Sequence, residues 1–266
     1  MTEISAPSGR KASYAFVGGA LIGCVGGLIG LGGAEFRLPL LIAVFGFAGL
    51  EAVILNKATS LVVVAAALPF RSSVVSLADI TGSWPVVLNL LAGSLVGAWT
   101  GAGWATRLST PTLYRVIAVL LVGVALTLVL GHGTDGREPA LTGVALLVAG
   151  VAAGFAIGVV ASLLGVAGGE LLIPTLVLLY GADIKLAGSL SLVVSLPTML
   201  VGFARYSSDR SFAALSTNRG FVMVMAAGSI LGAFIGAQLL GLVSNEVLLP
   251  VLAIILLVSA VKIWRH

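Results

Sequence analysis

Residues 27–41 read GLIGLGGAEFRLPLL, and residues 162–176 read SLLGVAGGELLIPTL. Each copy leaves an apolar run, passes through several glycines, presents one glutamate and enters a new apolar run around a proline. Corresponding residues lie a constant 135 positions apart: Gly30 and Gly165, Gly33 and Gly168, Glu35 and Glu170, Pro39 and Pro174. The sequence therefore predicts an internal duplication in which each half carries one glycine break and one acidic residue.

The composition excludes an ordinary soluble domain. Of the 266 residues, 59% are hydrophobic and 9% are charged, whereas soluble domains carry about 25% charged residues. Several apolar runs approach the roughly 20 residues that a helix needs to span a hydrocarbon core. These runs are continuous and lack the alternating polarity of barrel strands. We therefore expect an all-α integral membrane protein.

Charge and cysteine content point away from several function classes. The net charge of +4 is spread over loops rather than gathered on one face, so we expect no nucleic acid partner. Cys24 is the only cysteine, which excludes a disulfide within the chain and a paired metal or redox motif. No nucleotide loop, cofactor motif or nucleophile–base arrangement is present in the sequence. We expect a protein that is not an enzyme and has no cofactor.

The apolar runs divide the chain into two repeats of about five helical segments each. We expect a first transmembrane repeat over 12–131, a linker of turn-forming residues over 132–139 and a second repeat over 140–265. The segments are predicted near 12–31, 37–50, 52–70, 84–106, 112–131, 140–166, 170–182, 186–204, 220–242 and 246–264. Segments 37–50 and 170–182 are short, so each is either a half-helix or re-entrant hairpin, or a full span.

The basic residues predict cytoplasmic N- and C-termini. With ten crossings, ten of the fourteen basic residues fall on the cytoplasmic side, and Arg37, Arg71, Arg137 and Lys185 fall on the other. Five crossings in each half would insert the second half with the opposite orientation. The predicted arrangement is thus a pair of inverted repeats, a common plan among secondary transporters.

A second pair of matching stretches supports the duplication. Residues 93–102 match residues 228–237, again 135 positions apart, and both have glycines at every fourth position. Such glycines let two helix backbones approach closely in lipid. We interpret these stretches as packing surfaces.

The glycine breaks are candidates for a binding site. A run such as Gly30–Ala34 interrupts a helix and exposes N–H or C=O groups that lipid cannot satisfy. A helix that starts after the break presents free N–H groups and the positive end of its dipole to an anion. Pro39 and Pro174 suit the early turn of such a helix. The two breaks predict an anion site between two helix starts, the alternative being tight turns at the membrane surface.

Glu35 and Glu170 need a separate interpretation. A carboxylate beside an anion repels it unless the carboxylate is protonated or paired, and ionisable groups at membrane depth are usually functional. Arg37 is a candidate partner of Glu35 and a candidate substrate ligand. One hypothesis is that both glutamates carry protons and couple them to anion movement. The alternative is that both cap helix N-termini at the interface.

A polar cluster follows each break inside an apolar run. The candidate substrate ligands in these clusters are Asn56, Thr59, Ser60, Ser189 and Ser191. An ungapped repeat pairs Asn56 with Ser191 and places Lys57 within the membrane. A four-residue insertion pairs Ser60 with Ser191 and leaves Lys57 in a cytoplasmic loop. The sequence leaves both alignments open, and each hydroxyl has the alternative of bonding its own backbone.

The doubled motif, followed in each half by a Thr/Ser-containing run and a Gly-Ser-x-x-Gly-Ala helix, resembles the TauE/SafE family of membrane permeases, also called sulfite exporters. The resemblance covers the chain from about Ala15 to Trp264. It implies a duplicated helical permease of the inner membrane that moves sulfite, a sulfonate or a related organic acid, often outward. By analogy with the family motif, the glycines that shape the site are Gly30, Gly32, Gly33, Gly165, Gly168 and Gly169. The family's motif more commonly has a run of three or four glycines, and this sequence departs from it by placing Glu35 and Glu170 in the two stretches.

The expected function is a secondary transporter of a small anion, with H⁺ or Na⁺ as the coupling ion. One alternative is a cation-coupled or cation-selective permease in which Glu35 and Glu170 bind the cation. A second alternative is a membrane protein without a transport role.

Overall fold

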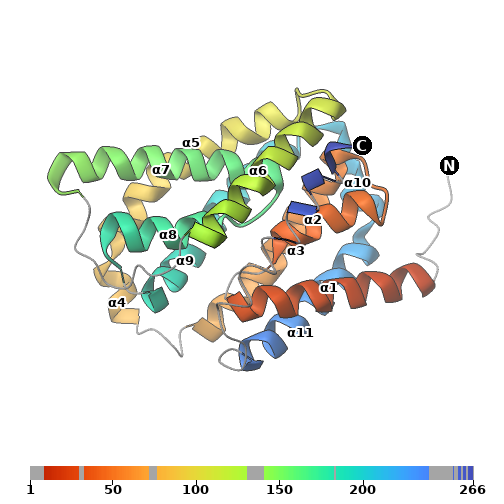
Figure 1. The fold of residues 1–266 in the computed structure, drawn as a ribbon, viewed down its shortest axis with the longest axis horizontal. Helices are drawn as coiled ribbons and strands as arrows, with labels where there is room; N and C mark the ends of the chain where they lie inside the picture. Colours follow the sequence, from red (N-terminus) through yellow and green to blue (C-terminus); the bar gives the residue numbers. More distant parts are fainter. Residues whose placement is uncertain are drawn as a thin grey trace.

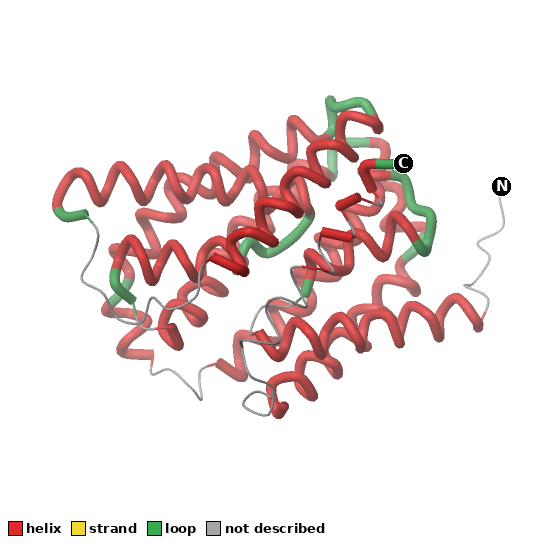
Figure 2. The backbone as a smooth tube through the Cα atoms, viewed as in Figure 1, coloured by secondary structure: helices red, strands yellow, loops and turns green. Residues whose placement is uncertain are grey.

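The computed structural model describes residues 9–29, 33–71, 77–130, 141–182 and 184–239, with residues 254, 257–258, 260–261 and 263–265 near the C-terminus. Within these ranges the chain consists of helices and short connections, without a strand (Figure 2). The all-α fold class is confirmed. The predicted linker 132–139 and most of the predicted segment 246–264 lie outside the described residues.

The helices follow the chain in two series (Figure 1). The first series contains α1 (Gly9–Ile29), α2 (Ala34–Ala43), α3 (Gly49–Arg71), α4 (Leu77–Gly82), α5 (Trp84–Ala105) and α6 (Thr110–Leu130). The second contains α7 (Gly143–Leu164), α8 (Gly169–Tyr180), α9 (Ile184–Tyr206), the 3-10 turn η1 (Arg210–Phe212), α10 (Ala213–Thr217) and α11 (Arg219–Leu239).

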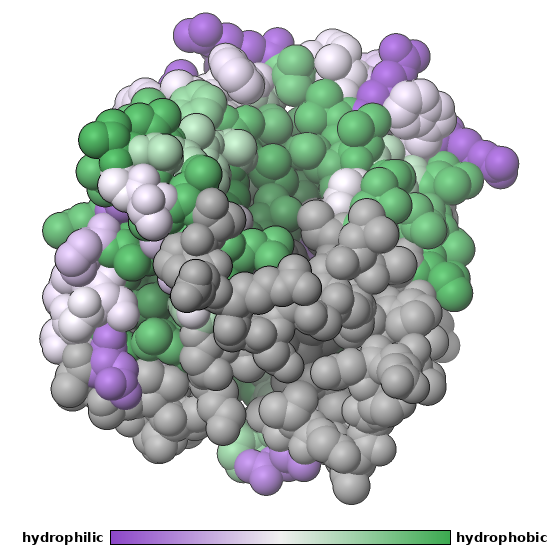
Figure 3. Space-filling view, turned by 60° about the vertical axis from the view of Figure 1, so that its left-hand side comes forward, coloured by the Kyte–Doolittle hydropathy of each residue, from purple (hydrophilic) through white to green (hydrophobic). Residues whose placement is uncertain are grey.

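Five of the described helices are long and apolar enough to cross a membrane. The candidate spans are Gly49–Ala66, Trp84–Ala105, Gly143–Leu164, Leu186–Tyr206 and Arg219–Gly236. Their outer faces carry apolar side chains, such as Val144, Leu147 and Val148 on α7. Figure 3 shows apolar side chains over much of the described surface in that view, with hydrophilic ones toward its margins. A surface of this kind is suited to lipid rather than to water.

Helices α2 and α8 are too short to span a bilayer. They contain 10 and 12 residues, so they are about 15 Å and 18 Å long at 1.5 Å per residue, against about 30 Å of hydrocarbon. This excludes the full-span alternative for segments 37–50 and 170–182. The predicted bounds of the first of these are displaced, because α2 begins at Ala34 and ends at Ala43.

The two series keep a constant register. Gly33 and Gly168, which precede α2 and α8, both have left-handed backbone and keep the offset that separates the two glycine stretches. Gly46 and Gly181, which precede α3 and α9, have left-handed backbone at the same offset. Beyond α3 and α9 the packing glycines Gly97 and Gly232 keep it as well. The ungapped alignment therefore holds, and Lys57 lies within α3 rather than in a loop.

The two most extensive helix pairings among the described residues join the two series. Helix α1 packs along α11, and α5 packs along α7 (Figure 1). A Cβ atom built on Gly97 of α5 would collide with the carbonyl oxygen of Phe155 on α7, and one on Gly232 of α11 would collide with that of Ala20 on α1. The predicted role of these glycines in close helix packing is confirmed.

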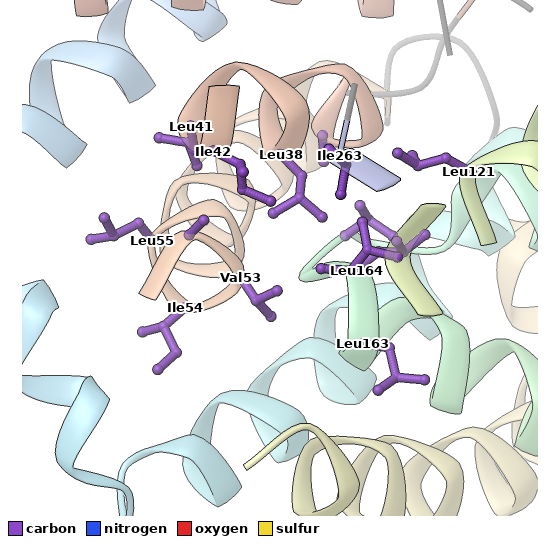
Figure 4. Close-up of a cluster of buried hydrophobic side chains, with 14 of the residues drawn as sticks. Leu38, Leu41, Ile42, Val53, Ile54, Leu55, Leu121, Leu163, Leu164 and Ile263 are labelled. Atoms are coloured by element: carbon purple, nitrogen blue, oxygen red, sulfur yellow. The ribbon is translucent and has the colours of Figure 1, made fainter. Parts of the chain in front are cut away.

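A hydrophobic core surrounds the helix breaks. Leu38 of α2 and Val53 of α3 belong to the same buried cluster as Leu121 of α6, Leu164 of α7 and Ile263 (Figure 4). The cluster therefore includes the end of the helix that precedes the second break. Because apolar side chains pack around both breaks, any polar group placed there is withdrawn from water.

Candidate functional site

Glycines shape both breaks. Gly33 precedes α2 with φ of 64°, Gly165 follows the end of α7 with φ of 66°, and Gly168 precedes α8 with φ of 83°. This left-handed backbone conformation strongly favours glycine, because a Cβ atom would be strained there. Gly169 is the first residue of α8, whereas Gly30 and Gly32 lie outside the described residues. The predicted interruption of the helices at these positions is confirmed.

The two prolines do not lie where we expected them. Pro39 is the sixth residue of α2 and Pro174 the sixth of α8, so both are in the second turn. Proline has no N–H and cannot bond the carbonyl oxygen four residues earlier. That oxygen belongs to Glu35 in α2 and to Glu170 in α8. Both glutamates thus lose the helical donor to their main-chain oxygen.

Arg37 lies at the centre of a buried polar cluster. Its side chain is 0% exposed. Nη1 donates to Asn56 Oδ1 at 3.3 Å and to Ser60 Oγ at 3.0 Å, and Nη2 donates to Ser229 Oγ at 3.2 Å. These three partners are neutral, while Glu35, also buried, acts on the guanidinium electrostatically. The predicted ligands Arg37, Asn56 and Ser60 are therefore brought together.

Asn56 connects the two breaks. Its Nδ2 donates to the main-chain oxygen of Ala34 at 3.0 Å, where α2 begins, and to that of Leu164 at 3.1 Å, where α7 ends. Its Oδ1 accepts the bond from Arg37. The connection between α7 and α8 lies in the middle of the molecule (Figure 2). One amide side chain thus holds both interruptions and the buried cation in a fixed relationship.

Lys57 on α3 is a second buried cation near the breaks. Its side chain is 0% exposed, and Nζ donates to the main-chain oxygen of Ala161 and to Ser162 Oγ, both at 3.4 Å. The predicted topology counted Lys57 as a cytoplasmic charge and Arg37 as an external one. Both are buried in helices, so neither informs the orientation of the loops.

These features agree with the comparison to known families. The family model described as sulfite exporter TauE/SafE matches residues 15–263. The chain belongs to the TauE/SafE family. No curated protein and no solved structure matches it. As a member of this family with five apolar helices of spanning length, the chain is a multi-pass membrane protein of a transporter family.

Two of the predicted ligands in the TauE/SafE chain bond their own helices rather than Arg37. Thr59 Oγ1 bonds the main-chain oxygen of Leu55, and Ser191 Oγ bonds that of Gly188. Both hydroxyls follow the alternative of satisfying their own helix. Ser189 is buried, and Glu170 occupies the first turn of α8, with a side chain outside the described set. The structure does not bring Thr59 and Ser191 to Arg37.

The two clusters differ at several positions, and one of them is the position of the arginine. In the ungapped register Leu172 corresponds to Arg37, and Ser195 corresponds to Ser60. Ser195 Oγ is buried and makes no hydrogen bond within the described part of the chain. Position 172 is a leucine and offers Ser195 no guanidinium donor. Only the first cluster, among the described residues, carries a guanidinium.

Three buried polar residues near the helix breaks were not predicted from the sequence. Ser229 belongs to the stretch interpreted as a packing surface, yet it holds Arg37. Its counterpart in the first repeat, Ser94, is likewise buried and bonds Thr198 Oγ1 at 2.7 Å. Tyr206 is buried and donates to the main-chain oxygen of Ser162 at 2.8 Å. The recurrence of serine at 94 and 229 was a signal that could have identified this pair.

Proposed function

We propose that the protein is a secondary transporter that moves a small anion across the inner membrane, with sulfite, a sulfonate or a related organic acid as substrate. The observation that carries this proposal is the fully buried guanidinium of Arg37 beside the junction of two helix breaks. A charged side chain at membrane depth is expensive and is retained where it serves a pathway or site. The family's description as sulfite exporters supports an oxyanion as the substrate.

The chemistry around Arg37 favours an oxyanion. A planar guanidinium matches the paired oxygens of a carboxylate or of a sulfur oxyanion with two parallel N–H bonds. The hydroxyls of Ser60 and Ser229 and the amide of Asn56 are neutral acceptors of the same N–H groups. We infer that the anion exchanges with these oxygens during the transport cycle. The nearby first turn of α2 adds the positive end of a helix dipole.

The coupling ion is proposed to be a proton carried by Glu35 and Glu170. Both residues are in the first turn of the half-helix that follows a break. In its neutral form a carboxyl group there does not repel the anion, and in its charged form it does. Anion binding and protonation would therefore favour one another. This assignment follows the hypothesis drawn from the sequence.

Alternating access would use inverted repeats. We propose that residues 12–131 and 140–265 form the two repeats, with cytoplasmic termini. Two observations support this: left-handed glycines before corresponding helices recur at the offset of the sequence repeat, and α1 and α7 run in opposite directions in Figure 1. Such repeats can exchange conformations and open the site to either side of the membrane. The buried Arg37 cluster corresponds to a state in which the site is closed.

Counterflow in proteoliposomes tests the proposal. Vesicles containing the full chain and loaded with sulfite, methanesulfonate or succinate are diluted into the same labelled anion, and its uptake is followed. We expect uptake of at least one of these anions, its loss in Arg37→Met, and its retention in Arg115→Met, which removes an exposed arginine on α6. Flux of Na⁺ or H⁺ without any anion would favour the cation-selective alternative. Absence of all flux from wild-type vesicles would overturn the transporter assignment.

A further inference from the structure

The environment of Lys57 differs from that of Arg37 in one important respect. Its ammonium group is fully buried, yet within the described residues it contacts no carboxylate. Its two hydrogen bonds are long, at 3.4 Å each, and run to a main-chain oxygen and a hydroxyl of α7. A buried charge that lacks a counter-ion is costly. In its protonated form the amine of Lys57 is therefore only partly compensated by its neighbours.

The end of α7 supplies part of that compensation. Ala161 and Ser162 lie in the last turn of α7, which ends at Leu164. The C-terminus of a helix carries roughly half of a negative charge, which attracts a cation. Half of a charge does not neutralise an ammonium group. A mobile anion is the natural source of the remainder.

The end of α7 does not depend on Lys57 for its hydrogen bonds. The oxygen of Ala161 accepts the N–H of Val166 at 2.9 Å, and Ser162 Oγ donates to the oxygen of Ala98 at 3.0 Å. The oxygen of Leu164 is satisfied by Asn56. Lys57 can therefore withdraw without leaving a buried carbonyl of this turn unsatisfied, which would otherwise cost about 1–3 kcal/mol per group.

A glycine lets α9 approach the amine closely. A Cβ atom built on Gly202 of α9 would lie 3.0 Å from Lys57 Nζ and 2.7 Å from Ser162 Oγ. Lys57 thus stands where α3 of the first series meets α7 and α9 of the second. A change in the hydrogen-bond partner of Lys57 would therefore alter contacts in both series.

We propose that Lys57 is a second anion contact, whose amine exchanges the last turn of α7 for the transported anion. In the empty state the amine holds α3 against α7. In the loaded state an oxygen of the anion takes the place of Ala161 O and Ser162 Oγ, which releases α7 from α3. Anion binding is thereby linked to the separation of the two helices. This inference rests on the proposed function, since it requires an anionic substrate.

Thermal stability with and without the anion tests this role. We compare the wild type with Lys57→Met and Lys57→Arg in detergent, with sulfite and with methanesulfonate as probes. Replacing a poorly compensated buried charge by an apolar group of similar size is often neutral or stabilising. We therefore expect Lys57→Met to unfold at the wild-type temperature or above it, but to lose the stabilisation that the anion gives the wild type. Lys57→Arg, which retains the charge, should keep part of that stabilisation.

Flux measurements complete the design. We expect counterflow in Lys57→Met to fall at least tenfold, as in Arg37→Met, while Arg115→Met is unchanged. If Lys57→Met retains both the anion-dependent stabilisation and the flux, Lys57 is not an anion contact. If it unfolds at a lower temperature than the wild type without anion, and binds the anion normally when folded, the lysine is a structural residue and the inference is wrong. If the wild type itself responds to no anion, the proposed function fails and not merely this inference.

Discussion

The amide of Asn56 on α3 donates a hydrogen bond of 3.1 Å to the main-chain oxygen of Leu164, the last residue of α7 and 108 positions later in the chain. The same amide donates to Ala34 at the start of α2. Two interruptions that are distant in sequence are thus tied by a single side chain. A binding site built from both interruptions depends on this residue for its geometry.

Replacement of Asn56 by leucine should therefore destabilise the protein. The main-chain oxygens of Ala34 and Leu164 would each lose the hydrogen bond from the amide, and Arg37 would lose an acceptor. A buried group without its partner costs about 1–3 kcal/mol, so we expect a clear decrease in the unfolding temperature in detergent. Asn218→Leu is the control, because the side chain of Asn218 bonds Ala214 in its own turn. An unfolding temperature of Asn56→Leu equal to that of the wild type would contradict the assigned role.

Arg37→Lys separates the charge from the geometry of the guanidinium. A lysine ammonium is a point charge and cannot form the paired bonds of a planar fork. We expect counterflow of sulfite to decrease about tenfold through a higher KM, while the unfolding temperature stays close to that of the wild type. Ser229→Ala, which removes one hydrogen-bond partner of Arg37, should have a smaller effect. Equal transport by Arg37→Lys and the wild type would show that anion binding does not depend on the planar geometry of the guanidinium.

Gly97→Leu should disrupt the packing of α5 against α7. Any side chain at this position meets the backbone at Phe155, which cannot move without displacing α7. We expect loss of folded protein in size-exclusion chromatography, and the same result for Gly232→Leu on α11. Gly123→Leu on α6 is the matched control, because a Cβ atom there meets nothing within 4 Å. Similar yields for all three variants would argue against close packing as the reason for these glycines.

Glu35→Gln and Glu170→Gln test the proton hypothesis. Glutamine resembles the protonated acid and cannot release a proton, so a coupled transporter would no longer respond to a pH gradient. We expect anion exchange at equal pH to persist, while uptake driven by an inward proton gradient is lost. A lumenal pH dye measures this directly. Full retention of the pH dependence by Glu170→Gln would remove that residue from the coupling mechanism.

The repeated glycines made the fold largely predictable. Left-handed backbone at Gly33 and Gly168 requires glycine, so a repeated glycine stretch in an apolar chain locates the helix interruptions. Helix length was harder to predict. Apolar residues continue from Leu38 past Ala43 without a polar signal, and α2 ends there although the composition does not change. Gly46, with φ of 73°, lies three residues after that boundary, so a glycine again marks the break.

The polar site was only partly predictable, for a different reason. Arg37, Asn56 and Ser60 could be selected because polar groups are rare in apolar helices. Their contact with Ser229 could not, since it depends on α11 packing near α2 and α3, far away in the sequence. Lys57 was open between two alignments, and the glycines on either side of α3 and α9 decide between them. Thr59 and Ser191 show that a buried hydroxyl can serve its own helix.

The pairing of α1 with α11 and of α5 with α7 has a mechanical consequence. Each pair takes one helix from the first series and one from the second, and glycines bring the partners into backbone contact. Contact this close resists sliding. In the proposed transport cycle we therefore expect two composite units to move as rigid bodies, one built on α1 and α11 and the other on α5 and α7. The chain passes from one unit to the other more than once, so neither half expressed alone contains a complete moving part.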